Sequence, residues 1–180
     1  MKKILSLLIT TLLISGCTSP AEVTAPGFIA SCEQIRLLES ADKSALMECL
    51  DGSGEINFDQ LKGPLLINVW GSWCEGCKQE MPYFVELYQN PLFKSGQIQM
   101  LGINVEEKSR DDAFNYIQKS GMSWPNLEDT SGISKSIFGP GVPVTWFIDE
   151  NGKNIETKIG AYINKNQLFN QVEKAFGVKL

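Results

Sequence analysis

Runs of apolar residues alternate with segments whose apolar residues recur at helical spacing, and this alternation predicts an α/β fold. The run at 65–70, Leu-Leu-Ile-Asn-Val-Trp, predicts a buried strand, and the pattern over about 75–90 predicts the helix that follows it. The later elements expected are a strand at 98–105, a helix from 109 to 121, an extended segment at 124–127, a short helix at 133–138, a strand hairpin at 141–160 and a helix at 164–176. This order predicts a central mixed β-sheet flanked by helices.

Residues 28–63 precede this pattern and form an N-terminal extension. Two short β-type runs flank the turn sequence Asp-Gly-Ser-Gly at 51–54, so we expect a β-hairpin over 45–58. Segment 32–38 is expected to be a short helix or irregular structure, and 58–63 to form a single helical turn.

The first sixteen residues have the pattern of a signal peptide, with Lys2 and Lys3 ahead of a short apolar stretch. The sequence Leu-Ile-Ser-Gly-Cys that ends at Cys17 looks like a bacterial lipobox, which implies cleavage before Cys17 and a lipid on its sulfur. Simple secretion and an uncleaved anchor are the alternatives. We therefore expect a lipoprotein signal peptide at 1–16, a lipidated cysteine with a flexible tether at 17–27, and one domain at 28–180, held on the outer side of a bacterial cell membrane.

Charge and composition limit the kinds of partner that the protein can be expected to bind. The chain has 180 residues and a net charge of −5, and losing the two lysines of the signal peptide makes the mature part −7. Basic residues do not cluster, so we expect no nucleic-acid partner. The 164 residues after the signal peptide suffice for one ordinary domain, which we expect to be monomeric.

Cys74 and Cys77 form a Cys-x-x-Cys pair at the junction of the predicted strand and helix. The free N–H groups and the dipole of a helix start favour a negative charge, so Cys74 ionises more readily than a free thiol. Cys77 lies one turn further and can close a disulfide with it. A dithiol of this kind exchanges disulfides with other proteins and needs no cofactor.

A zinc site and a purely structural disulfide are the alternatives for this pair. Zinc needs four ligands, the chain contains no His, and the spacing of Cys32 and Cys49 is not that of a second zinc knuckle. We expect no metal. A purely structural disulfide is also disfavoured, because a disulfide across a two-residue spacer closes a short loop and stabilises the fold little.

The cysteine count predicts a second disulfide. Once Cys17, Cys74 and Cys77 are assigned, Cys32 and Cys49 remain as an even pair in an oxidising compartment. A disulfide closing a loop of this size stabilises by about 3 kcal/mol. A second redox centre is the alternative.

The motif Trp73-Cys74-x-x-Cys77, the later Gly-Val-Pro at 141–143 and the hairpin after it resemble a thioredoxin fold. Asn68 stands where thioredoxin has a buried Asp. Three further features resemble the TlpA/ResA/CcmG family of extracytoplasmic thiol–disulfide oxidoreductases. They are the strand sequence Asn-Val-Trp-Gly-Ser-Trp-Cys, the Glu-Met-Pro after the motif and an inserted strand–helix. The resemblance covers about 45–178.

The resemblance implies roles for the residues of the motif. Cys74 corresponds to an exposed attacking cysteine and Cys77 to a buried resolving one. Glu80 corresponds to a carboxylate that manages protons at the thiols, with a solvated helix charge as the alternative. Trp73 corresponds to a cover over the site, or to a core residue.

The resemblance also implies how a partner binds. Pro143 corresponds to a cis-proline beside the disulfide, and Val142 offers its backbone to an extended partner segment. Without the resemblance, Pro143 reads as a trans proline at the start of a strand. The family often has Glu-Pro between the cysteines, whereas this chain has Glu75-Gly76.

The function we expect is reduction of protein disulfides, for example in apocytochrome c, with electrons exchanged with a membrane partner. The helix start favours the thiolate and hence an oxidant, whereas Glu75 and Glu80 oppose it and favour a reductase. An oxidase that introduces disulfides is the first alternative. A copper metallochaperone is the second, although such proteins usually add a His ligand, and a binding module with an incidental Cys pair is the third.

Overall fold

The computed structural model describes residues 25–41 and 44–180 of the chain. The expected signal peptide at 1–16, the lipidation site Cys17 and most of the expected tether lie outside these described residues. Within the described residues, we find no helix with the length and apolar character needed to cross a bilayer.

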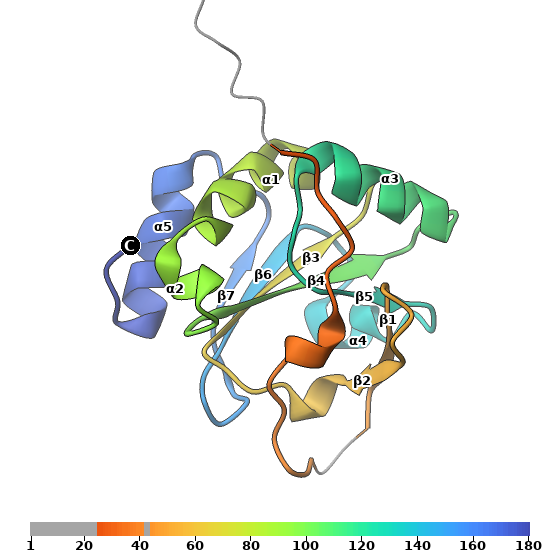
Figure 1. Cartoon of the computed structure of the whole chain (residues 1–180), viewed down its shortest axis with the longest axis horizontal. Helices are drawn as coiled ribbons and strands as arrows, with labels where there is room; N and C mark the ends of the chain where they lie inside the picture. Colours follow the sequence, from red (N-terminus) through yellow and green to blue (C-terminus); the bar gives the residue numbers. More distant parts are fainter. Residues whose placement is uncertain (1–24, 42–43) are drawn as a thin grey trace, which may run out of the picture.

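One seven-stranded mixed sheet forms the centre of the fold, in the order β2-β1-β5-β4-β3-β6-β7 (Figure 1). The strands are β1 Leu46–Cys49, β2 Glu55–Asn57, β3 Leu65–Trp70, β4 Gln99–Val105, β5 Asn126–Asp129, β6 Val144–Ile148 and β7 Asn154–Ile159. β3 pairs in parallel with β4 and antiparallel with β6, and β4 pairs in parallel with β5. This arrangement confirms the α/β thioredoxin-like fold with a mixed sheet.

The helices begin and end close to the positions that the sequence predicts. They are α1 Glu75–Tyr88, α2 Pro91–Lys94, α3 Arg110–Ser120, α4 Ser134–Phe138 and α5 Lys165–Phe176. Ser109 and Asn164 cap α3 and α5 with their side chains, and Gly121 ends α3 in the left-handed conformation that glycine favours. Helix α2, which the sequence pattern does not predict, begins with Pro91 at its first position after the capping residue Asn90.

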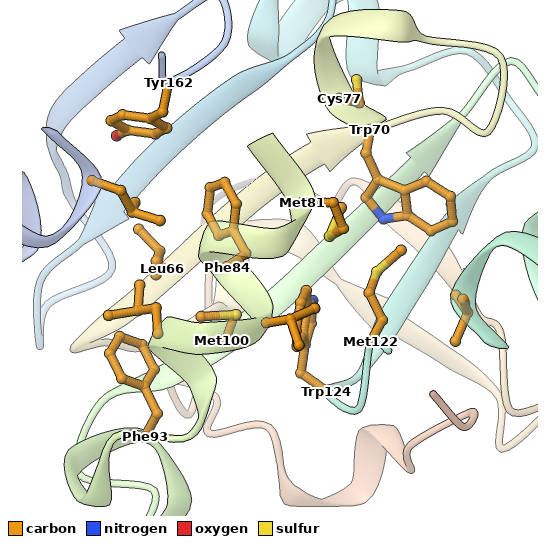
Figure 2. Close-up of a cluster of buried hydrophobic side chains, with 14 of the residues drawn as sticks. Leu66, Trp70, Cys77, Met81, Phe84, Phe93, Met100, Met122, Trp124 and Tyr162 are labelled. Atoms are coloured by element: carbon orange, nitrogen blue, oxygen red, sulfur yellow. The ribbon is translucent and has the colours of Figure 1, made fainter. Parts of the chain in front are cut away.

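Helices α1, α3 and α5 lie on one face of the sheet, and α4 lies on the other (Figure 1). Successive residues of β3 therefore enter two different cores, which is why the whole strand is buried. Leu66 and Trp70 join the cluster under α1, whereas Leu65, Ile67 and Val69 join the cluster under α4. Figure 2 shows the first cluster, in which Met81 and Phe84 of α1 lie over Trp70 and Leu66.

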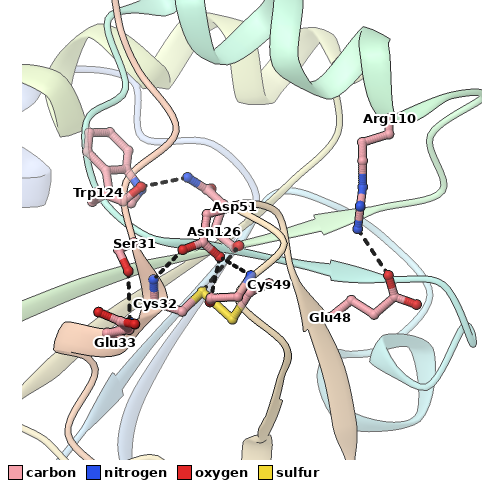
Figure 3. The surroundings of a disulfide bond; sticks show 10 residues. Ser31, Cys32, Glu33, Glu48, Cys49, Asp51, Arg110, Trp124 and Asn126 are labelled. Atoms are coloured by element: carbon pink, nitrogen blue, oxygen red, sulfur yellow. Dashed lines mark hydrogen bonds and ion pairs between the residues drawn. A yellow bond between two sulfur atoms is a disulfide. The ribbon is translucent and has the colours of Figure 1, made fainter.

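The N-terminal extension adds two strands to the sheet. β1 and β2 form the expected hairpin, and β1 also pairs antiparallel with β5. Two short 3-10 helices, η1 Cys32–Gln34 and η2 Phe58–Gln60, precede and follow the hairpin. The structure pairs Cys32 with Cys49, which ties η1 to β1 (Figure 3). The extension is thus part of the same core as the redox domain.

Candidate active site

The Cys-x-x-Cys motif lies where β3 leads into α1. Cys74 is the N-cap residue of α1, and its sulfur accepts a hydrogen bond of 3.1 Å from the backbone N–H of Cys77. The two sulfurs are bonded at 2.09 Å. When this bond opens, the same N–H and the helix dipole stabilise a thiolate on Cys74.

Cys74 is less exposed than the family resemblance implies. Only 5% of Cys74 and none of Cys77 is accessible, so Cys74 is the more accessible of the two without standing free on the surface. The reason is that, in the disulfide form, Cys74 is joined to a buried partner and packs in the cluster that contains Trp70 and Met81.

Glu80 is fully buried, one turn after Cys77 on α1, and is therefore not a solvated helix charge. Its Oε1 accepts a hydrogen bond from Asn68 Nδ2 at 3.2 Å, and its Oε2 accepts one from the backbone N–H of Tyr162 at 2.9 Å. Burial raises the pKa of Glu80 to about 7, while these hydrogen bonds and the charge of Lys158 oppose the rise. The carboxyl therefore gains and loses its proton near neutral pH.

Two tyrosines near this carboxyl stay protonated. Burial, reinforced by the charge of Glu80, raises the pKa of both Tyr116 and Tyr162 above the ordinary value of a phenol. Asn68 leaves its Oδ1 buried without a hydrogen-bond partner. Of these buried groups, only the carboxyl of Glu80 titrates in the neutral range, and it lies on the same helix as the cysteines.

The loop after β7 brings the separate parts of the site together. The N–H of Gly160 donates to the carbonyl of Pro143 at 2.9 Å. Two residues later, the N–H of Tyr162 donates to Glu80. A Cβ built on Gly76 would lie 3.3 Å from Pro143 Cδ and 3.5 Å from Ala161 Cβ. The Val142–Pro143 peptide bond is cis, and Pro143 packs beside the active-site turn.

Trp73 is not a core residue. It is 48% exposed, and its Nε1 donates to the carbonyl of Val105 at 3.3 Å. Its ring therefore forms an apolar edge directly before Cys74. With Val142, which is partly buried, it lines a small pocket whose wall also includes Val105 and Phe138.

Glu107 is a residue of the site that the sequence pattern does not indicate. Its carboxylate accepts hydrogen bonds from the backbone N–H and the hydroxyl of Ser72, and from Asn104 Nδ2 at 2.9 Å. These bonds hold the residues just before Trp73 and Cys74 in place. The surrounding sequence, Glu-Glu-Lys-Ser, reads as an ordinary solvated loop, so only the three-dimensional contact with Ser72 reveals the role.

Cys32 and Cys49 lie apart from this site, in the core on the other face of the sheet. Together with Asp51 they form a group of metal-ligand type within the part of the chain that the structure describes. Its two sulfurs are bonded to each other, and Asp51 accepts a hydrogen bond from the N–H of Cys32 at 3.2 Å. The atoms that could bind a metal are therefore already engaged, the two sulfurs in a disulfide and the carboxylate of Asp51 in a hydrogen bond (Figure 3).

Comparison with known proteins agrees with this geometry. A family model described as the AhpC/TSA family matches residues 40–156. The thiol–disulfide oxidoreductase ResA of Bacillus thuringiensis (strain Al Hakam) is 31% identical over 151 residues, which cover 82% of this chain and 83% of the relative. The chain belongs to the AhpC/TSA family and is a thiol–disulfide oxidoreductase of the ResA kind. A second ResA, from Bacillus cereus (strain ZK / E33L), is 29% identical and covers 97% of this oxidoreductase and 98% of the relative.

Solved structures support the fold of this oxidoreductase. A secreted disulfide oxidoreductase of Mycobacterium tuberculosis superposes with a TM-score of 0.62 at 18% identity, covering 73% of this chain and 96% of that one. The exposed lipoprotein thioredoxin of Streptococcus pneumoniae strain TIGR4 gives 0.57 at 23% identity, covering 73% and 99%. ResA-like oxidoreductases act on protein thiols, and the Cys74–Cys77 disulfide is the group of this chain suited to that chemistry.

Proposed function

We propose that this oxidoreductase reduces disulfides of protein partners with a Cys74–Cys77 dithiol, while tethered outside the cytoplasm by a lipid on Cys17. The observation that carries the redox part is the disulfide at the start of α1 with the buried carboxyl of Glu80 one turn beyond it. Trp73, Val142 and Pro143 form the surface that receives the partner, and the Cys32–Cys49 disulfide is structural.

The reaction proceeds in two exchanges. The Cys74 thiolate attacks one sulfur of the partner's disulfide, the partner's S–S bond breaks, and its other sulfur leaves as a thiolate that takes up a proton. Cys77, which has lost its proton to the Glu80 carboxylate, then attacks the sulfur of Cys74. The mixed disulfide breaks, and the partner departs as a dithiol. The partner has gained two electrons, and Cys74 and Cys77, which have lost them, are joined in a disulfide. A membrane electron donor restores the dithiol.

The reduction potential of the Cys74/Cys77 couple tests the direction. Glu75 and Glu80 are negative neighbours that disfavour the thiolate, and one pKa unit, about 1.4 kcal/mol, corresponds to about 30 mV for a two-electron couple. We therefore expect a reducing potential, toward the thioredoxin value of about −270 mV. A potential near the DsbA value of about −120 mV would contradict the reductase and support an oxidase.

The client is tested by trapping. In Cys77→Ala the second exchange is blocked, so the mixed disulfide with Cys74 accumulates. We expect apocytochrome c among the partners recovered from the cell envelope under non-reducing conditions. Recovery of secreted enzymes that carry structural disulfides, without apocytochrome c, would contradict this assignment of the client. Copper titration of the reduced protein tests the metallochaperone alternative, and we expect no tight binding.

The lipid anchor is supported by the lipobox-like sequence before Cys17 and by the fold shared with the exposed lipoprotein thioredoxin of Streptococcus pneumoniae. A single substitution can test the lipid anchor without changing the redox cysteines. Cys17→Ser should move the protein from the membrane fraction to the soluble fraction while leaving the redox activity of Cys74 and Cys77 unchanged. Retention in the membrane fraction would contradict the lipid anchor.

A further inference from the structure

We propose that Lys158 is a positioning residue of the redox site, which fixes the loop at 159–162 and supplies a positive charge to the Glu80 carboxylate. This inference rests on the proposed role of Glu80 as the acceptor of the Cys77 proton, and it depends on neither the lipid anchor nor the direction of electron flow. Lys158 stands in β7, far from the Cys-x-x-Cys motif in the sequence.

The ammonium group of Lys158 folds back on the chain that follows it. Its Nζ donates to the carbonyl oxygens of Ile159 and Gly160, both at 2.8 Å, and to that of Ala161 at 3.4 Å. Three consecutive carbonyls therefore converge on one cation, as they do where lysine satisfies the free acceptors of a turn. Removing the cation would leave these carbonyls without their shared donor.

This convergence sets the direction of the amide groups in the same loop. With the carbonyls turned to Lys158, the N–H of Gly160 meets the carbonyl of Pro143, and the N–H of Tyr162 meets Glu80, each at 2.9 Å. Ala161, between them, lies beside the turn at Gly76. Lys158 thus fixes a loop that contacts the proline, the active-site turn and the buried carboxyl together.

Charge gives Lys158 a second effect on the same carboxyl. The groups around Glu80 are Asn68 from β3, Cys77 on its own helix, the neutral phenols of Tyr116 from α3 and Tyr162, and Lys158. Burial raises the pKa of Glu80, and the positive charge of Lys158 opposes that rise. Without Lys158, the carboxylate that takes the proton of Cys77 would form only at higher pH.

A simpler role for Lys158 is protection of the sheet edge. β7 is an edge strand, and lysine on such a strand discourages pairing with another chain. That role requires a charge presented to solvent, whereas the ammonium of Lys158 is bound by the protein's own carbonyls. Edge protection also predicts no change in the pH dependence of the redox reaction, so the two roles are separable.

The test follows the reaction of the reduced full chain with 5,5′-dithiobis(2-nitrobenzoate) between pH 5 and 9 in stopped flow. Attack by Cys74 releases the first thionitrobenzoate, and attack by Cys77 on the resulting mixed disulfide releases the second. The rate of the second release therefore reports the step that uses Glu80. The variants are Lys158→Met and Lys158→Arg, with Lys153→Met as the matched control, because Lys153 lies at the hairpin turn before β7 and outside the site.

We expect Lys158→Met to move the midpoint of the second release to higher pH by up to about one unit, the scale of the effect of one neighbouring charge. Lys158→Arg, which keeps the charge, should restore at least half of the shift, and Lys153→Met should show none. Equal midpoints in Lys158→Met and Lys153→Met would overturn the proposal. If Lys158→Met does not fold, Lys158→Gln replaces it, and failure of both to fold while Lys158→Arg keeps the wild-type profile would assign Lys158 to stability and also overturn the proposal.

Discussion

Glu80 and Asn68 are the residues whose chemistry depends most on their surroundings. A glutamate after a Cys-x-x-Cys motif looks like any exposed helix charge in the sequence, but in the fold its side chain points into the core and meets Asn68 of β3. The family resemblance was needed to single it out, because burial depends on the packing of α1 against the sheet. Glu107 shows the limit of such reasoning, since its contact with Ser72 joins two loops that are distant in the sequence.

The raised pKa of Glu80 predicts a pH-dependent stability. The folded disulfide form holds this proton more tightly than the unfolded chain does, because the pKa rises from 4.5 to about 7. The stabilisation is therefore complete below pH 4.5 and is lost as the pH rises through about 7, a loss of about 3 kcal/mol. Glu80→Gln, which keeps the shape and has no proton to lose, should be more stable than the wild type at pH 8 by about that amount.

Urea unfolding of the oxidised protein at pH 4.5 and pH 8 measures this difference. We expect the wild type to lose stability between the two pH values and the Glu80→Gln variant to lose much less. Rotation of the Asn68 amide lets its Oδ1, which has no partner in the wild type, accept a hydrogen bond from the new amide. An equal loss in both proteins would show that other groups dominate the pH dependence.

The carboxylate of Glu107 is predicted to stabilise the segment before the motif. Glu107→Ala removes the acceptor for Ser72 and Asn104 and should lower the free energy of unfolding by about 2 kcal/mol, because these bonds involve a charged acceptor. Glu106→Ala is the matched control, since Glu106 makes an exposed ion pair with Lys135 and such pairs contribute less than about 1 kcal/mol. Equal losses in chemical denaturation would refute the special role of Glu107.

At the scale of elements, the strand–helix order is what the sequence predicts best. β3, β4, α1, α3 and α5 have long apolar patterns and clear caps, so local rules and the final fold agree. The addition of β1 to β5 was not predicted, because a hairpin pattern does not reveal which strand it joins. The short α2 was missed since four residues carry too little periodicity to detect.

The neighbouring parallel strands β3, β4 and β5 contain a close approach that predicts a strong effect of one substitution. A Cβ built on Gly102 in β4 would lie 1.8 Å from Asn126 Oδ1, which accepts a hydrogen bond from Trp70 Nε1 at 3.0 Å. Gly102→Ala therefore breaks this buried hydrogen bond or displaces β5, and we expect a loss of about 3 kcal/mol in unfolding free energy.

Gly141→Ala serves as the control for this substitution. A Cβ at Gly141 meets no atom within 4 Å, and its backbone is not in the left-handed region. Its free energy of unfolding should stay within about 0.5 kcal/mol of the wild type. Comparable urea midpoints for the two variants would mean that β4 and β5 separate without penalty.

At the scale of the whole molecule, one sheet divides two cores with different tasks. The core under α1 contains Cys77 and Glu80, and the core under α4 contains the Cys32–Cys49 disulfide. We therefore expect the two disulfides to have separable roles, one in the redox reaction and one in stability. The sequence predicts the Cys74–Cys77 pair from its Cys-x-x-Cys motif and the Cys32–Cys49 pair from the cysteine count, but only the fold places the two pairs on opposite faces of the sheet.

Removing each disulfide in turn tests this division. Cys32→Ala with Cys49→Ala opens a loop with a separation of 17 residues and should lower the free energy of unfolding by about 3 kcal/mol while preserving the redox reaction of the other pair. Cys74→Ala with Cys77→Ala opens a separation of 3 and should change stability little while abolishing the reaction. Loss of redox activity in the folded first variant would contradict the separation.

The carboxyl of Glu80 also links the electrochemistry of the domain to the acidity of its surroundings. Each two-electron reduction draws protons from solvent, and a buried acid with a pKa of about 7 in the disulfide form changes how many are drawn around neutrality when opening of the disulfide shifts that pKa. A plot of midpoint potential against pH should therefore bend near that value. A change in the acidity around the protein would therefore change the driving force available for the reduction of every client.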